Sequence, residues 1–311
     1  MSRSICGVDV ASTTLAAALP GQRVQTFART PEGVSALAAA CRAHGVDLLV
    51  MEATGGFEQM PLALLWAQGV PCALANPRNV RQFAQAMGVL EKADHIDPGV
   101  IARYAQAAGL QPQAPRRTEQ ERLRALVTRL SQLTALRVAQ ANQRRLTQEP
   151  AVLASIDEVI ALVRRQERAI EGQIAALVEA DPLWGALAGA LRGVKGVASR
   201  TVARLLAELP EIGTLTGKAA AKLVGLAPIT CESGSVVGRR RVRGGRAGVR
   251  GTLYVVAEIV RRHEPDFAAF AQTLSQQGKP KKVVRVALAR KLLVRLNAKA
   301  RDARLALPQP T

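Results

Sequence analysis

The chain has 311 residues, with 43 Lys and Arg against 24 Asp and Glu, and its formal net charge is +19. The length predicts two domains rather than one. The charge indicates a polyanionic partner, with nucleic acid as the first candidate and an acidic membrane surface as the second. Aromatic residues make up only 3%, which disfavours base stacking as the main mode of binding and favours contacts to backbone phosphates.

The four cysteines follow no metal-binding or disulfide pattern. Cys6, Cys41, Cys72 and Cys231 include no CxxC pair, so neither a zinc site nor a disulfide framework is expected. The N-terminus MSRSICGVDV lacks a long apolar segment, and no apolar run of about 18 residues occurs in the chain. We therefore expect a cytoplasmic protein with no membrane partner.

The first part of the chain has the pattern of a mixed α/β domain. Short apolar runs alternate with segments of helical periodicity, and Pro and Gly mark their ends. In chain order we predict strands over 4–11, 14–20 and 23–30, a helix over 31–45, a strand over 47–53, a helix over 57–69, a strand over 71–75 and a helix over 77–87. The order βββαβαβα resembles a ribonuclease H-like fold.

The stretch GVLEKADHIDPGVIARYA, residues 88–105, contains two carboxylates three positions apart. Asp94 and Asp97 would share one face of a helix. One interpretation is a helix start, where the dipole favours acidic residues. The other is half of a metal site, completed by Asp9 and Glu52 at the ends of the first and fourth predicted strands, because ligands gather at the carboxyl ends of strands. An all-carboxylate site suits Mg²⁺ or Mn²⁺, which would assist a phosphodiester displacement.

Two further carboxylates, Glu58 and Glu91, stand near this cluster in the sequence. We interpret both as surface residues. Because a lone Asp or an Asp-x-x-Asp pair is common, the metal hypothesis depends on the order Asp, Glu, Asp, Asp along the predicted elements.

The middle of the chain has the periodicity of long helices. Apolar residues recur at three- and four-residue steps over 116–180, with an interruption at Pro150. The pattern predicts an antiparallel hairpin or coiled coil, which would serve as a spacer and an oligomerisation element. An ordinary packed pair of helices is the alternative.

Almost all of the excess positive charge lies in the C-terminal part. Residues 1–189 hold 19 Lys and Arg against 17 Asp and Glu, whereas residues 190–311 hold 24 against 7. A charge that served only solubility would not be divided in this way, so we predict that the C-terminal part binds a polyanion. The last stretch, 278–306, is predicted to be a basic amphipathic helix after a short linker, suited to a phosphate backbone or a membrane surface.

Two segments of this part are candidate phosphate-binding elements. VKGVASRTVARLLAEL resembles a helix-hairpin-helix, with Lys195, Gly196 and Arg200 as the clamp, and a simple packed helix–turn–helix is the alternative. CESGSVVGRRRVRGGRAGVRGTLY is rich in glycine and arginine, and arginine forks suit phosphate oxygens. Its candidate ligands are Arg239, Arg240, Arg241, Arg243, Arg246 and Arg250. A polar loop with solvated charges is the alternative.

Several of these segments together resemble one family. GVDVA, MEATGG, ANPRNVRQFAQAMG and EKADHIDPGVIARYA, in this order, resemble the N-terminal domain of the DEDD transposases of insertion-sequence family one-ten, whose relatives include the Piv-type DNA invertases. VKGVASRTVARLLAELPEIG, KLVGLAPITCESGS and GRRRVRGGRAGVRGTLYVVA resemble its C-terminal transposase domain. The acidic motif departs from the usual one at Ala93, His95 and Pro98. Since Pro is tolerated only in the first turn of a helix, we expect this helix to begin near Asp94 or Asp97.

The resemblance implies a RuvC-like nuclease domain whose metal ligands match Asp9, Glu52, Asp94 and Asp97. It also implies that Ser233, of the Ser-Gly pair, attacks a DNA phosphate and forms a covalent phosphoserine, with metal assistance. The active site would be composite, with acidic and serine halves from different protomers of a homodimer or homotetramer. Many members use a noncoding bridge RNA to choose target and donor DNA. The setting would be the bacterial cytoplasm, at the nucleoid when DNA is bound.

The expected organisation is α/β followed by α: a RuvC-like (ribonuclease H-like) domain over 1–112, a helical hairpin over 113–184, and a basic, mainly helical transposase domain over 185–311. The leading function is a DNA transposase or site-specific recombinase. A protein-only DNA invertase, a metal-dependent structure-selective nuclease and a basic nucleic-acid-binding protein with structural carboxylates are the alternatives. Ser235 is a rival nucleophile, and His95 has no assigned role.

Overall fold

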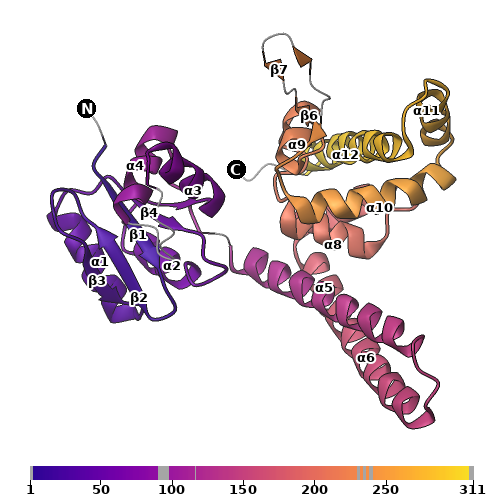
Figure 1. The fold of residues 1–311 in the computed structure, drawn as a ribbon, viewed down its shortest axis with the longest axis horizontal. Helices are drawn as coiled ribbons and strands as arrows, with labels where there is room; N and C mark the ends of the chain where they lie inside the picture. The colour runs from indigo at the N-terminus through magenta and orange to yellow at the C-terminus, as the bar shows by residue number, and fades with distance from the viewer. Residues whose placement is uncertain are drawn as a thin grey trace. The chain divides into compact units, whose positions relative to one another are not determined.

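The computed structural model describes residues 3–89, 98–115, 117–229 and 241–307, together with the backbone of 232–233 and 236–237. The chain divides into two compact units, Met1–Arg116 and Arg117–Thr311, and each is considered by itself (Figure 1). The first unit is α/β and the second is mainly helical, in agreement with the expected class. The expected domain boundaries at residues 112 and 184 stay a prediction. In the structure the helices of the expected hairpin belong to the second unit.

The elements of the first unit follow the predicted order of three strands, then alternating helices and strands. They are β1 (Ile5–Val10), β2 (Thr14–Ala18), β3 (Gln25–Ala28), α1 (Pro31–Ala43), β4 (Leu48–Glu52), α2 (Gln59–Ala67), β5 (Cys72–Ala75), α3 (Pro77–Ala86) and α4 (Pro98–Ala108). Local signals set several ends: Thr30 caps α1 and Asn76 caps α3, and each helix begins with Pro.

The five strands form one mixed sheet in the order β3-β2-β1-β4-β5. β1 is antiparallel to β2 and parallel to β4, and β4 is parallel to β5. Buried residues of α1 and α2 pack on one face of the sheet, and those of α3 and α4 pack on the other (Figure 1). This arrangement fits a RuvC-like domain.

Helix α4 approaches β1 at Gly7 more closely than any side chain would allow. A Cβ atom on Gly7 would lie 2.0 Å from the carbonyl oxygen of Pro98 and 2.7 Å from the amide nitrogen of Ala102. Both are backbone atoms, so neither can turn aside. Pro98 is the first residue of α4, in agreement with the prediction that this Pro stands in a first turn. Asp94 and Asp97 lie outside the described residues.

The second unit begins with the predicted helical hairpin, α5 (Thr118–Arg144) and α6 (Pro150–Ala180). Arg144 pairs with Asp157 near the tip, and Arg137 pairs with Glu167 further along, so the two helices are antiparallel. Glu167 is buried, and Thr134 Oγ1 and Arg137 Nε donate to its carboxylate at 2.7 and 3.0 Å. The role of the hairpin in oligomerisation stays a prediction.

The remaining helices pack around one long helix at the C-terminus. They are α7 (Pro182–Arg192), α8 (Ser199–Glu208), α9 (Gly217–Val224), α10 (Ala247–His263), α11 (Pro265–Gln276) and α12 (Lys281–Leu305). Leu288, Leu292, Leu293 and Leu296 of α12 are at most 1% exposed and lie in the core. The predicted helix after a short linker is therefore present as α12, and its apolar side chains pack in the core of this domain.

The described residues between α9 and α10 form four two-residue strands: β6 (Pro228–Ile229), β7 (Glu232–Ser233), β8 (Val236–Val237) and β9 (Arg241–Val242). β6 pairs with β9, and β7 pairs with β8, both antiparallel. We call residues 226–243 the serine arm. At its base, a Cβ atom on Gly225 would lie 2.2 Å from the carbonyl oxygen of Gly244, so the outgoing and returning chains touch.

No single helix among the described residues is long and apolar enough to cross a membrane, although α6 and α7, bent by 112°, meet the length and composition criteria as a pair.

We predict that Gly7→Ala destabilises the first unit by about 3 kcal/mol or more, because the added methyl group meets the backbone of α4. Denaturant unfolding followed by circular dichroism measures the effect. Gly189→Ala in α7 is the control, since a Cβ there meets no atom within 4 Å, and it should stabilise by about 0.5–1 kcal/mol. A Gly7→Ala protein as stable as the wild type would contradict the close approach.

Candidate active site

Asp9 and Glu52 lie side by side at the carboxyl ends of two parallel strands. Val8 pairs with Met51 in the β1–β4 register, and each carboxylate is the next residue of its strand. Side chains alternate along a strand, so both point to the α3–α4 face, the face that Leu48 and Val50 also occupy. This confirms that the sheet brings the two predicted ligands together.

The environment of Glu52 is unfavourable for a lone carboxylate. Within the described residues its Oε2 atom is buried and has no hydrogen-bond partner. Burial, and then the charge of Asp9, raises the pKa of Glu52 above its ordinary value. A positive partner would offset both effects on Glu52, because burial and a nearby negative charge disfavour its ionised form.

A divalent cation is a partner that fits this chemistry. Carboxylate oxygens are the ligands that Mg²⁺ and Mn²⁺ prefer, and the buried Oε2 of Glu52 is an acceptor without a donor. Among the residues that the structure describes, no three His, Cys, Asp or Glu side chains are grouped as a metal site. Within the described residues, Asp9 and Glu52 are therefore two carboxylates that fit a divalent cation by their chemistry, without a third such group beside them.

The start of α4 lies close to this pair. Gly7, which touches Pro98, is two residues before Asp9 on the same strand and the same face. The close approach of α4 to β1 thus brings the beginning of that helix to the side of the sheet that carries the carboxylates.

Glu58 is not the surface residue that the sequence suggested. It is 4% exposed, and its Oε2 atom accepts hydrogen bonds from the amides of Thr54 and Gly56 at 3.1 and 2.9 Å. Burial alone would raise its pKa, but the backbone amides of Glu58 itself, Gly56 and Thr54 together outweigh burial and lower the pKa of Glu58. The donors to Glu58 are loop amides, and the sequence does not reveal how these amides are oriented. The adjacent glycines Gly55 and Gly56 were the one sequence feature that indicated an unusual loop conformation here.

Ser233 is the last residue of β7, opposite Val236 in the serine arm. The structure describes its backbone only, and Ser235, Arg239 and Arg240 lie outside the described residues. Ser233 and the acidic pair belong to different compact units.

The arginines predicted to bind phosphate divide into two groups. Arg246 donates to both carboxylate oxygens of Glu211, at 2.5 and 2.6 Å, and to the carbonyl of Glu208 at 2.9 Å. Arg250 donates to the carbonyl of Gly244. Both therefore hold the base of the serine arm, and any contact with phosphate would compete with these bonds.

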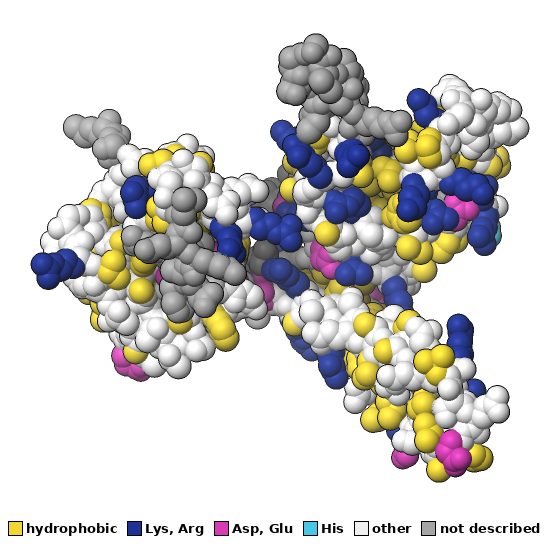
Figure 2. Space-filling model, in the orientation of Figure 1, with side chains coloured by type: hydrophobic (Ala, Val, Ile, Leu, Met, Phe, Trp, Pro, Cys, Tyr) yellow, Lys and Arg dark blue, Asp and Glu magenta, His cyan; other side chains and the backbone are white. Residues whose placement is uncertain are grey.

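Arg241 and Arg243 differ, because both are exposed and neither forms an ion pair within the described part of the chain. They are the predicted phosphate ligands whose side chains are available in this structure. Figure 2 shows many more Lys and Arg side chains on the visible face of the second unit than on that of the first, as the sequence predicts.

The turn between α7 and α8 is closely packed. Gly196 is so close to α10 that a Cβ atom there would lie 3.2 Å from the amide nitrogen of Val260, and the Lys195 amide donates to Glu264 at 3.3 Å. Arg200 pairs with Glu171 and Glu167 of α6. These contacts favour the packed helix–turn–helix, and the phosphate clamp stays a prediction.

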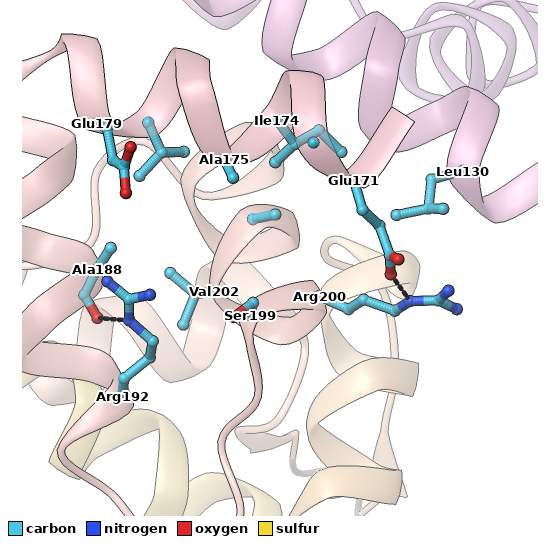
Figure 3. A pocket seen from close by; sticks show the side chains of 13 residues that line it. Leu130, Glu171, Ile174, Ala175, Glu179, Ala188, Arg192, Ser199, Arg200 and Val202 are labelled. Carbon is cyan, nitrogen blue, oxygen red and sulfur yellow. Dashed lines mark hydrogen bonds and ion pairs between the residues drawn. The ribbon is translucent and has the colours of Figure 1, made fainter. Parts of the chain in front are cut away.

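A groove with a cavity volume of about 450 Å³ runs between α6, α7 and α8 (Figure 3). Leu130, Ile174 and Val202 contribute to its apolar lining. Arg200 and Glu171 lie at one end, and Arg192 and Glu179 lie at the other. The ion pair of Arg200 therefore forms part of the groove wall.

Comparison with known proteins agrees with this architecture. Residues 6–148 match a DEDD domain of the IS110 type described as transposase, and residues 188–272 match a domain described as transposase of the IS116/IS110/IS902 family. The pilin gene-inverting protein of Moraxella bovis is 25% identical over 94% of each chain, and that of Moraxella lacunata gives the same values. A protein of insertion element IS110 from Streptomyces coelicolor is 33% identical over 49% of this chain and 37% of its own.

The site and these matches define a DNA transposase or recombinase, an enzyme that acts on DNA. The class generally uses a divalent metal. The two domain matches occur in the expected order and together span most of the chain, so the protein belongs to the IS110 family of transposases.

We predict that Glu52→Gln raises the melting temperature of the metal-free protein by a few degrees at pH 7. Because the folded pKa of Glu52 is raised, its stabilising contribution is complete below the unfolded pKa and is lost as the pH rises through the folded value. The increase in melting temperature that Glu52→Gln gives at pH 7 should therefore disappear near pH 4. Thermal unfolding of both proteins at pH 4 and pH 7, with chelator present, measures this difference.

The matched control for this measurement is Glu32→Gln, which removes an exposed carboxylate from the first turn of α1. This change should give no increase in melting temperature at pH 7. A Glu52→Gln protein that melts at or below the wild-type temperature at pH 7 would show that the buried carboxylate is already neutralised by the protein.

Proposed function

We propose that this chain cleaves and rejoins DNA by a serine phosphodiester exchange assisted by Mg²⁺ or Mn²⁺, to move its own insertion element. The pairing of Asp9 with Glu52, one oxygen of which has no hydrogen-bond partner in the described chain, carries the proposal. Asp94 and Asp97 are taken as the remaining carboxylates. In support, Asp97 immediately precedes Pro98 in the sequence, and Pro98 touches Gly7.

In the proposed reaction the Oγ atom of Ser233 attacks a DNA phosphorus atom. The Oγ–P bond forms while the bond from phosphorus to one sugar oxygen breaks. The serine gives up its proton, and the departing sugar oxygen takes up a proton. A sugar hydroxyl of the exchanged strand then attacks the phosphoserine and releases Ser233, so the number of phosphodiester bonds is conserved.

The chain's own charges have separate tasks in this scheme. Asp9 and Glu52 hold the metal, which supplies positive charge against the phosphate oxygens when it is bound. Arg241 and Arg243, which are exposed residues of the serine arm, bind the phosphates on either side of the reacting one. Arg246 keeps the arm in position through Glu211.

We further propose that the two halves of the active site come from different protomers of a homodimer or homotetramer. The support is the division of the chain, which puts the acidic pair and Ser233 into separate compact units. A shared site would require assembly on both DNA partners before cleavage, and this would prevent isolated breaks.

Target choice is proposed to depend on a noncoding bridge RNA, with the family resemblance as support. A protein-only invertase is the second candidate. The pilin gene-inverting relatives favour it, because they match 94% of this chain, whereas the insertion-element relative matches 49%.

We predict that a covalent protein–DNA adduct forms in the presence of Mg²⁺ and falls at least about 10³-fold in Ser233→Ala. Ser235→Ala is the matched control and should stay within about tenfold of the wild type. Denaturing electrophoresis of labelled DNA measures the adduct. Metal-dependent strand cleavage with no adduct in the wild type would contradict the serine mechanism and would indicate a nuclease that uses water.

The guide hypothesis predicts that one defined RNA co-purifies with protein expressed beside its native flanking DNA. A basic protein traps random RNA, so the expected result is enrichment of a single species that maps to that flank. Sequencing of the bound RNA tests this. Recombination of the flanking DNA without any enriched RNA would overturn the guide and support the protein-only invertase.

A further inference from the structure

Phe57 is an exposed aromatic residue in a chain with few aromatics. Its exposed fraction is 45%, whereas Phe267 is fully buried. The guanidinium carbon of Arg29 lies 5.0 Å from the ring centroid of Phe57, and Arg29 Nε donates to the carbonyl of Ser12 at 2.6 Å. An exposed ring with a fixed arginine against it forms a flat surface that combines an apolar face with a positive charge.

This surface lies at the edge of the sheet where the strands that carry the acidic pair end. Ser12 follows Asp9 by three residues in the turn after β1, and Phe57 follows Glu52 by five residues in the loop after β4. The contact of Arg29 with both loops therefore joins the two segments that leave the carboxylates.

The loop that carries Phe57 is stabilised by the buried carboxylate of Glu58. The Oε2 atom of Glu58 accepts hydrogen bonds from the Thr54 and Gly56 amides, and Gln59 Nε2 donates to Oε1 at 3.1 Å. A Cβ atom placed on Gly55 or Gly56 would meet nothing within 4 Å, so the space around this part of the loop is open. Phe57 is thus presented on a fixed loop with room for a ligand.

We propose that Phe57 and Arg29 form a platform on which an unpaired nucleobase stacks next to the scissile phosphate, with Arg29 also attracting the backbone. The proposal rests on the proposed function, because strand exchange requires bases near the cut to leave their pairs. Stacking on one aromatic ring is worth about 1–3 kcal/mol per base. The low aromatic content disfavours base stacking as the main source of affinity for the whole chain. A single stacking ring near the site agrees with this, because most of the affinity would still come from phosphate contacts.

The test uses the full chain, chelator to prevent cleavage, and a short single-stranded oligodeoxynucleotide that contains 2-aminopurine. Stacking on Phe57 should quench the fluorescence, and Phe57→Leu should abolish this quenching and weaken binding by about 5- to 150-fold. Phe57→Trp should restore both. Trp66→Leu is the control, since Trp66 is 37% exposed on α2, nine residues further along the chain.

Quenching that is unchanged in Phe57→Leu, with an unchanged melting temperature, would overturn the proposal. An oligoribonucleotide of the same sequence distinguishes the source of the base, since stronger quenching by RNA assigns the platform to a guide. The assay needs no catalysis, so it separates the two proposals. If quenching depends on Phe57 but the protein never cleaves DNA, the stacking platform is supported and the proposed reaction is rejected.

Discussion

The first unit depends on the contact between Gly7 of β1 and the first turn of α4. The Glu52 carboxylate, which is paired with Asp9 at the strand ends, carries a charge that burial and the neighbouring Asp9 both disfavour. Because the backbone of α4 lies directly against β1, the helix that follows Asp97 in the chain begins beside this pair. The absence of a side chain at Gly7 therefore determines where α4 begins relative to the sheet.

The second unit separates scaffold charges from charges that remain available. Arg200, Arg246 and Arg250 are used within the chain, where they join α8 to the hairpin and hold the base of the serine arm. Arg241 and Arg243 stay exposed. A high net charge thus indicates a nucleic-acid partner for the domain, but it does not identify which arginines bind it, since buried carboxylates such as Glu167 recruit some of them.

Much of the fold and part of the site could be predicted from the sequence. Short apolar runs and segments of helical periodicity, with Pro and Gly at their ends, predicted the strands and helices of the first unit, and the strand ends predicted that Asp9 and Glu52 lie together. The rest depends on contacts distant in sequence. The buried state of Glu58 follows from loop amides, and the core position of α12 follows from four neighbouring helices that cover its leucines. A pattern of basic and apolar residues cannot distinguish such a helix from a surface one.

The central claim is that Asp9 and Glu52 hold a divalent metal for DNA strand exchange. Its most direct test is a crystal structure of the full chain grown with Mn²⁺, with an anomalous difference map collected to locate the metal. We expect a manganese peak within coordination distance of one oxygen from Asp9 and the buried Oε2 of Glu52, with a carboxylate from the segment before Pro98 as a further ligand. Manganese bound only elsewhere, with both carboxylates uncoordinated, would contradict it.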